Sequence, residues 1–120
     1  MSKRDVTPHL GMSPAMFQVL LALSDGDKHG YAILKEILRR TGGTVRLSPG
    51  TLYGIINRLL QEGLVVESRQ RPDPSLDDER RRYYHLTDFG QQVARAEAER
   101  LESLVEQARA KRLLPGTEIA

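Results

Sequence analysis

The residues best suited to chemistry form the segment Ser48-Pro49-Gly50-Thr51, which opens a helix predicted over residues 52–60. A helix N-terminus presents unpaired N–H groups and the positive end of the helix dipole, so it attracts an anion such as a phosphate. Gly50 would let a phosphate approach the backbone closely, and the hydroxyls of Ser48 and Thr51 can each add a hydrogen bond. Taken alone, however, such a segment is more often a capped helix start with nothing bound.

The helix that follows has two different faces. Its apolar residues recur at helical spacing and predict a buried side: Leu52, Ile55, Ile56, Leu59 and Leu60. The other side carries Tyr53, Asn57 and Arg58. Asn can bond adenine through two hydrogen bonds, Arg can do the same with guanine, and Tyr commonly contacts phosphate. On this helix alone, a solvated polar face is an equally good interpretation.

A basic ribbon comes next and favours recognition of nucleic acid over a solvated face. An apolar run at residues 64–66 leads outward, and residues 80–86 return. Arginines occupy both strands of this ribbon and could reach phosphates or a minor groove: Arg69, Arg71, Arg80, Arg81 and Arg82. Tyr84 and Leu86 alternate onto one face, where we expect them to pack on the core. Acidic residues at Asp73 and 77–79 leave open whether the tip of the ribbon touches DNA.

The surrounding elements are predicted from their caps and periodicity. Ser13-Pro14 begins a first helix, residues 30–40 form a second, and residues 45–47 form a very short strand before the helix at 52–60. Thr87 caps a long helix from Asp88 to about Leu113. The predicted fold class is therefore mainly α with a small antiparallel β wing, a winged helix-turn-helix followed by a long C-terminal helix. The expected division is a flexible N-terminal arm at 1–12, a winged-helix DNA-binding domain at 13–87, a dimerisation helix at 88–113 and a disordered tail at 114–120.

The long C-terminal helix predicts a protein partner. Small and apolar residues follow a heptad-like stripe along it: Ala94, Ala98, Leu101, Leu104, Val105 and Ala108. One long helix attached to a small head cannot bury such a stripe alone. A second copy of the chain is the simplest source of a partner helix, so we predict a homodimer.

Composition argues against other classes of function. The 120 residues include no cysteine and carry a net charge of +2, which by itself is no argument for nucleic acid. His9, His29 and His85 are scattered, so we expect no metal site and no cofactor, and the chain has no nucleophile elbow, P-loop or dinucleotide fingerprint. An enzyme is not expected. No signal peptide or membrane span is visible, and the expected location is the cytoplasm.

Four motifs together resemble the PadR family of bacterial transcriptional regulators. They are His29-Gly30-Tyr31, Leu47-Ser48-Pro49-Gly50-Thr51-Leu52-Tyr53, Glu62-Gly63-Leu64-Val65 and Arg82-Tyr83-Tyr84-His85-Leu86-Thr87-Asp88-Phe89-Gly90. The similarity covers about residues 13–112. The single terminal helix is similar to that of the short subgroup of the family.

The resemblance implies a winged-helix head, a homodimer and repression of the protein's own or neighbouring genes through a roughly palindromic operator. The helix starting at Ser48 would enter the major groove, with Thr51, Tyr53 and Asn57 near the DNA. Lys28 and Tyr31 would lie near phosphate, and residues 80–82 would sit on the wing. The C-terminal helix would pack against the partner's N-terminal helix, where Phe17 lies.

Some short members bind planar apolar compounds between the protomers, helped by a tryptophan. This chain has no tryptophan, so the identity of any small-molecule effector stays open. The preferred interpretation is a dimeric DNA-binding repressor, with relief by a small molecule as a hypothesis. The alternative is a winged-helix protein-interaction module that does not bind DNA, which the acidic wing and modest net charge favour.

Overall fold

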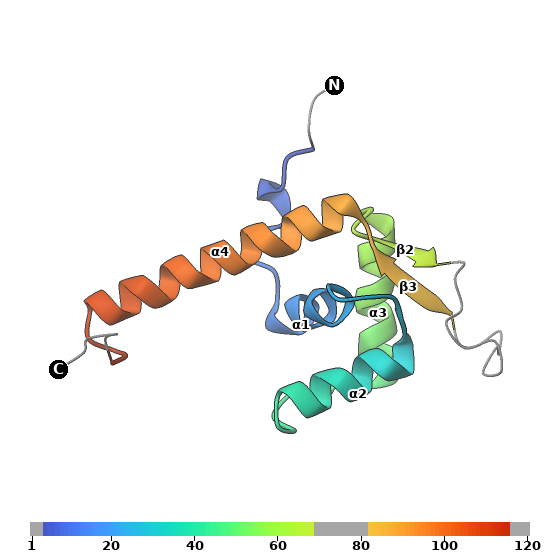
Figure 1. Ribbon diagram of the computed structural model, residues 1–120, viewed down its shortest axis with the longest axis horizontal. Helices are drawn as coiled ribbons and strands as arrows, with labels where there is room; N and C mark the ends of the chain where they lie inside the picture. Colours follow the sequence, from blue (N-terminus) through green and yellow to red (C-terminus); the bar gives the residue numbers. More distant parts are fainter. Residues whose placement is uncertain (1–3, 69–81, 116–120) are drawn as a thin grey trace.

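The computed structural model describes residues 4–68 and 82–115, and in this part of the chain the strands β2 and β3 lie at one side of a group of helices (Figure 1). The elements in chain order are a 3-10 turn η1 (Thr7–His9), α1 (Pro14–Leu23), β1 (Lys28–His29), α2 (Gly30–Arg40), α3 (Pro49–Gln61), β2 (Val65–Ser68), β3 (Tyr83–Leu86) and α4 (Asp88–Ala110). This is the predicted winged helix-turn-helix with a long terminal helix.

The sheet is antiparallel, with β3 in the middle of the order β1-β3-β2. Val65 pairs with Leu86, and His29 pairs with Tyr83. The expected strand at residues 45–47 is wrong, because those residues form no strand and β1 occupies the free edge of β3 instead. Val45 and Leu47 still pack against the core, so their apolar character reflected burial rather than strand pairing.

Helix starts follow the predicted capping chemistry. The hydroxyls of Ser13, Ser48 and Thr87 each accept a hydrogen bond from the backbone N–H three residues on, which satisfies one unpaired donor per helix. His29 caps α2 in the same way, because its Nδ1 accepts a hydrogen bond from the Ala32 N–H. At the other end of α3, Gly63 adopts φ +75° while Leu64 N–H bonds the carbonyl of Leu59. That left-handed turn favours glycine and stops the helix.

The core gathers apolar side chains from every layer of the head. Its fully buried members come from α1, α2, α3, β2, α4 and the turn before β2: Val19, Leu20, Ile33, Ile37, Leu52, Ile56, Leu59, Leu64, Val65 and Val93. Tyr84 and Leu86 pack on this core, as predicted. Tyr83 on the opposite face of β3 is also buried, with its ring edge against His29 at 5.3 Å.

Residues 4–12 of the predicted N-terminal arm contact the head at several points. The Arg4 guanidinium lies 3.8 Å from the centre of the Phe89 ring and donates a hydrogen bond to the Glu62 carbonyl. Further along, the Gly11 N–H donates to the carboxylate of Glu97 at 3.0 Å. The arm therefore joins the end of α3 to α4 over residues 4–12.

Helix α4 is anchored at one end and extends away from the head at the other (Figure 1). A Cβ at Gly90 would lie 2.1 Å from the Leu64 carbonyl oxygen, so only glycine permits this close approach of α4 to the chain before β2. The helix ends at Ala110 rather than at the expected Leu113, because Arg112 takes φ +64° and reverses the chain there. Within the ranges given above, no helix is both long and apolar enough to cross a membrane.

Candidate nucleic-acid interface

Helix α3 turns its polar face outward. Leu52, Ile56 and Leu59 are buried beneath it, which leaves the opposite side in solvent. The exposed side carries the contact residues that were predicted within the body of α3: Thr51, Tyr53, Asn57 and Arg58. The structure therefore brings these residues together on one helical face.

The start of α3 is both capped and open. Ser48 Oγ accepts a hydrogen bond from the Thr51 N–H at 3.1 Å and donates one to Thr51 Oγ1 at 3.0 Å. Both residues are exposed, and so is Gly50, where the nearest atom to an added Cβ is 4.0 Å away. Pro49 has no N–H, and the N–H groups of Thr51 and Leu52 bond Ser48, so the group that an anion could reach at this exposed helix end is the Gly50 N–H.

A close contact fixes α2 against α3. A Cβ at Gly30 would lie 2.4 Å from the Tyr53 hydroxyl oxygen, so glycine is required for this tyrosine to lie where it does. Tyr53 remains 40% exposed and Tyr31 is 61% exposed. The role of Gly30 was not predicted, and its place between His29 and Tyr31 at a helix start is the sequence signal that could have indicated it.

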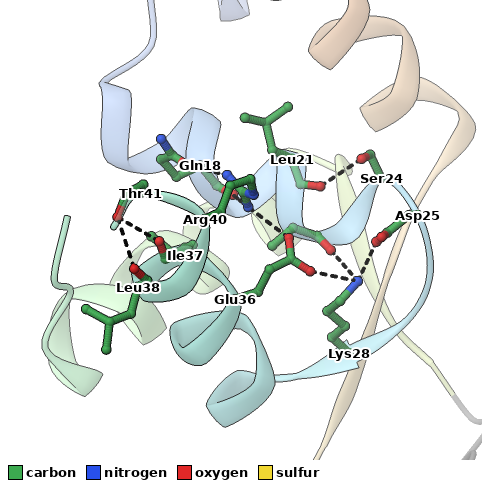
Figure 2. Close-up of polar contacts among 11 residues, drawn as sticks. Gln18, Leu21, Ser24, Asp25, Lys28, Glu36, Ile37, Leu38, Arg40 and Thr41 are labelled. Atoms are coloured by element: carbon green, nitrogen blue, oxygen red, sulfur yellow. Dashed lines mark hydrogen bonds and ion pairs between the residues drawn. The ribbon is translucent and has the colours of Figure 1, made fainter. Parts of the chain in front are cut away.

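Lys28, which was expected near phosphate, is held by internal partners (Figure 2). Its ammonium donates to the Ala22 carbonyl at 2.6 Å and to the Asp25 carboxylate at 2.5 Å, and it lies 3.4 Å from a carboxylate oxygen of Glu36. Glu36 also binds Arg40 at 2.9 Å. With these bonds satisfied, Lys28 holds β1 against α1 and α2, and we omit it from the proposed DNA contacts.

The predicted arginines have different environments. Arg58 lies 3.4 Å from Glu62 on the same helix, and Arg82 lies 3.8 Å from Glu67 across the sheet. Both side chains are mostly exposed, so these ion pairs are weak and a phosphate could displace them. Arg80 and Arg81 lie outside the described residues, as do Arg69, Arg71 and the acidic stretch.

The predicted packing stripe on α4 divides in two. Ala94 is buried in the protomer's own core, which corrects its assignment to a dimer contact. Farther along, Leu104 is 46% exposed and Val105 is 38% exposed. Ala98 is exposed as well, while Leu101, Ala108 and Phe17 of α1 are half-buried. The apolar surface left over lies on the part of α4 beyond the head.

Two carboxylates outside α3 have close polar partners, one across the chain and one within α4. His85 Nδ1 lies 2.7 Å from the Asp27 carboxylate. Burial raises the pKa of Asp27, but hydrogen bonds from Ser68 and His85 outweigh it and the pKa is lowered overall. Glu97 is almost fully buried, and both of its oxygens accept hydrogen bonds from Arg100, at 2.9 and 2.8 Å. In residues 4–68 and 82–115, no three His, Asp or Glu side chains converge as a metal site would require.

The capped helix α3, the three-stranded sheet and the long terminal helix agree with the family comparison. The model of the transcriptional regulator PadR-like family matches residues 19–96. The chain belongs to this PadR-like family. Its members are transcriptional regulators and not enzymes.

Two curated relatives illustrate the relationship. A transcriptional regulator of Mycobacterium tuberculosis is 35% identical over 86 residues, which cover 72% of this chain and 74% of that protein. An uncharacterized 37.1 kDa protein of a Streptomyces fradiae transposon is 39% identical over 84 residues. That match covers 70% of this chain, which thus spans only 22% of the transposon protein's length.

Solved structures share the fold. A PadR family regulator from Clostridium difficile has a TM-score of 0.68 at 21% identity, with 82% of this chain and 97% of that chain covered. Bacillus subtilis PadR, solved in complex with operator DNA, has a TM-score of 0.57 at 18% identity, with 90% of this chain and 51% of that chain covered.

Proposed function

We propose that this PadR-family protein binds double-stranded DNA as a homodimer and represses its own or neighbouring genes. The observation that carries the proposal is the exposed polar face of α3, with its open, capped N-terminus at Ser48. The complex of Bacillus subtilis PadR with operator DNA supports this use of the fold. A cytoplasmic location follows from the proposal.

In this proposal α3 enters the major groove. Asn57 and Arg58 face base edges, while Ser48, Gly50 and Thr51 receive a phosphate at the helix start. Tyr31 and Tyr53 contact the backbone beside the groove, and residues 80–82 of the wing reach an adjacent phosphate or minor groove.

The proposal is tested by fluorescence anisotropy with the DNA upstream of the protein's own gene, against a scrambled duplex over a salt series. We expect tight, selective binding that weakens by about 0.9 logarithmic units per neutralised phosphate for each tenfold rise in salt. Asn57→Ala should reduce affinity for the upstream DNA more than for the scrambled duplex. Gln92→Ala, an exposed amide of α4, is the matched control and should change neither.

Absence of binding to any duplex would contradict the proposal. The alternative of a protein-interaction module without DNA binding would then take its place. Unchanged selectivity in the Asn57→Ala variant would remove that side chain from base recognition.

Dimerisation is proposed through the exposed half of α4, with Leu101, Leu104, Val105 and Ala108 packing on the partner subunit. Phe17 and Ala98 border the same surface. A twofold dimer would present two α3 helices to half-sites about 34–36 Å apart on one face of DNA, which explains why a palindromic operator is expected. Sedimentation equilibrium at micromolar concentrations should give the mass of a dimer, and a monomer mass would contradict this assignment.

Relief of repression by a small molecule completes the proposal. A ligand that changes the spacing of the two heads would lower DNA affinity, and linkage requires DNA to lower ligand affinity by the same factor. A thermal-shift screen repeated with and without the upstream duplex would detect such a ligand. A compound that stabilises both forms equally would not be an effector.

A further inference from the structure

A row of exposed cations runs along the outer side of α2. Lys35 and Arg39 are four residues apart, so they lie on the same helical stripe as Tyr31. Arg46 in the segment between α2 and α3 is exposed as well. We call Lys35, Arg39 and Arg46 the outer cations.

The outer cations differ from the other basic residues of this region by having no acidic partner. None of them forms an ion pair with a carboxylate of the described residues. By contrast, Lys28 and Arg40 share the carboxylate of Glu36 on the inner side of α2 (Figure 2). Glu36 of α2 therefore neutralises Lys28 and Arg40, whereas the outer cations stay uncompensated by any carboxylate of the described residues and create a positive potential on their side.

A shallow groove connects Lys35 with Arg46. It measures about 300 Å³ and is lined by Tyr31, Leu34, Lys35, Leu38, Arg46 and Leu47. The leucines give this groove an apolar floor along which the stems of Lys35 and Arg46 can extend, while their charged ends stay in water. The Lys35 ammonium lies 5.3 Å from the centre of the Tyr31 ring, a distance at which the ring attracts the cation and limits its freedom.

The groove adjoins the end of α3 that is open to an anion. Arg46 precedes the capping residue Ser48 by two positions, so their Cα atoms are at most about 7 Å apart. Tyr31 lies at the other end of the row. It follows Gly30, which is in close contact with the hydroxyl of Tyr53. The groove that holds the outer cations thus lies next to the start of α3 in the chain.

We propose that the outer cations bind phosphates of the DNA backbone beyond the half-site that α3 reads. This inference rests on the proposed function and extends the interface along α2. Lys35, Arg39 and Arg46 replace Lys28 as the source of positive charge on this side of α3. Contacts to phosphate carry no sequence information, so the row increases affinity for all duplexes and sets the position of the head.

The experiment compares two triple variants with equal changes of charge. The test variant is Lys35→Gln/Arg39→Gln/Arg46→Gln. The control variant is Arg95→Gln/Lys111→Gln/Arg112→Gln, which removes three exposed cations from α4 and its end. Glutamine preserves much of each apolar stem, and thermal unfolding verifies that both variants fold as the wild type does.

Binding is measured with the upstream duplex and with a scrambled duplex of equal length, from low to physiological salt. The test variant should lower the salt slope of the dimer by about 5.4 relative to the wild type, because three phosphates per protomer, and so six per dimer, are no longer neutralised. At 0.15 M salt, each lost contact should weaken binding about fivefold. The loss should be the same for both duplexes, and the control variant should retain most of the wild-type slope.

The outcomes separate this inference from the proposed function. If the wild type binds with a steep slope and the test variant behaves like the control, the outer cations do not contact DNA and only this inference is overturned. If the wild type binds no duplex at all, the proposed function and the inference are both overturned. A loss confined to the upstream duplex would overturn a sequence-independent contact.

Discussion

Helices α3 and α4 are both amphipathic, yet they leave opposite kinds of surface exposed. Helix α3 buries its apolar side within the protomer and presents Thr51, Tyr53 and Asn57 to solvent. Helix α4 buries only its first turns and leaves Leu104 and Val105 uncovered beyond the head. The surface of α3 suits a polar, charged partner, whereas that of α4 suits another apolar helix.

An amphipathic pattern alone therefore does not identify the partner that a helix binds. The partner depends on which face of the helix is buried in the protomer's own core and which face stays exposed. Because α1, α2 and the sheet cover the apolar side of α3, the side that stays exposed can bind a partner mainly through hydrogen bonds. Because the distal half of α4 extends past the head, its apolar side chains can be buried only against a partner, and this burial favours association in water.

The largest expected effect concerns the exposed apolar surface of α4. Leu104→Asp/Val105→Asp should weaken dimerisation by at least about 4 kcal/mol, or a thousandfold, because both protomers lose two buried apolar side chains. Sedimentation equilibrium measures the change, and circular dichroism should show an unaltered helix content. Leu113→Asp, beyond the end of α4, is the matched control. An unchanged dimer constant would place the interface elsewhere.

The next effect concerns the hydrogen bonds of Glu97, which lies where the buried half of α4 meets its exposed half. Hydrogen bonds from Arg100 and the Gly11 N–H, opposed by burial, hold the pKa of Glu97 below its usual 4.5. The ionised form therefore stabilises the fold above that pH, and this stability is lost as the pH falls through the lowered pKa.

Glu97→Gln should lower the free energy of unfolding at pH 7 by about 2 kcal/mol, because bonds to a charged group are lost. The variant should also lose less stability than the wild type on acidification below about pH 4.5. Urea unfolding across a pH series measures both effects. Glu99→Gln, an exposed neighbour on α4, should leave both nearly unchanged.

A smaller effect sharpens the description of the α3 face. Gly54 is exposed on α3, and an added Cβ there meets no atom within 4 Å. Gly54→Ala should raise the free energy of unfolding by about 1 kcal/mol, the usual gain in a helix interior. If this face approaches DNA, the same variant should bind the upstream duplex more weakly despite its greater stability. Increased affinity would contradict the proposed orientation of α3.

The smallest effect compares the ends of the two helices. Helix α3 closes at Gly63 with φ +75°, whereas α4 closes at Arg112 with φ +64°. A side chain in this left-handed conformation is strained, so Arg112→Gly should stabilise the protein by about 0.5 kcal/mol. Gly63→Ala should do the reverse by about 1 kcal/mol. Thermal unfolding measures both, and equal midpoints would show that the surroundings absorb the strain.

Much of the fold was predictable because its signals are local. Ser13, Ser48 and Thr87 each cap a helix that begins at the next residue, so the helix starts could be predicted from short segments. The period of the apolar residues in α3 likewise identified Leu52, Ile56 and Leu59 as buried. The exposed face opposite them, with Tyr53 and Asn57, followed from the same periodicity.

Other features depended on pairings between distant segments and were missed. The third strand lies at Lys28–His29 rather than at residues 45–47, because the free edge of β3 selects its neighbour in space. The ammonium of Lys28 forms ion pairs with Asp25 and Glu36. The spacing of these residues did not predict the pairs, and Lys28 was expected near phosphate. The contacts of the arm with Phe89 and Glu97 are equally long-range.

Caps and periodicity act over a few residues, so the sequence alone was enough to predict where the helices begin and which of their faces are apolar. It was also enough to predict that a basic ribbon follows α3. Which charged side chains have no partner of opposite charge depends on the tertiary structure. Ion pairs form where the packing of α1, α2 and the sheet brings acids and bases together. That packing neutralises Lys28 and leaves Lys35, Arg39 and Arg46 without a carboxylate among the residues described.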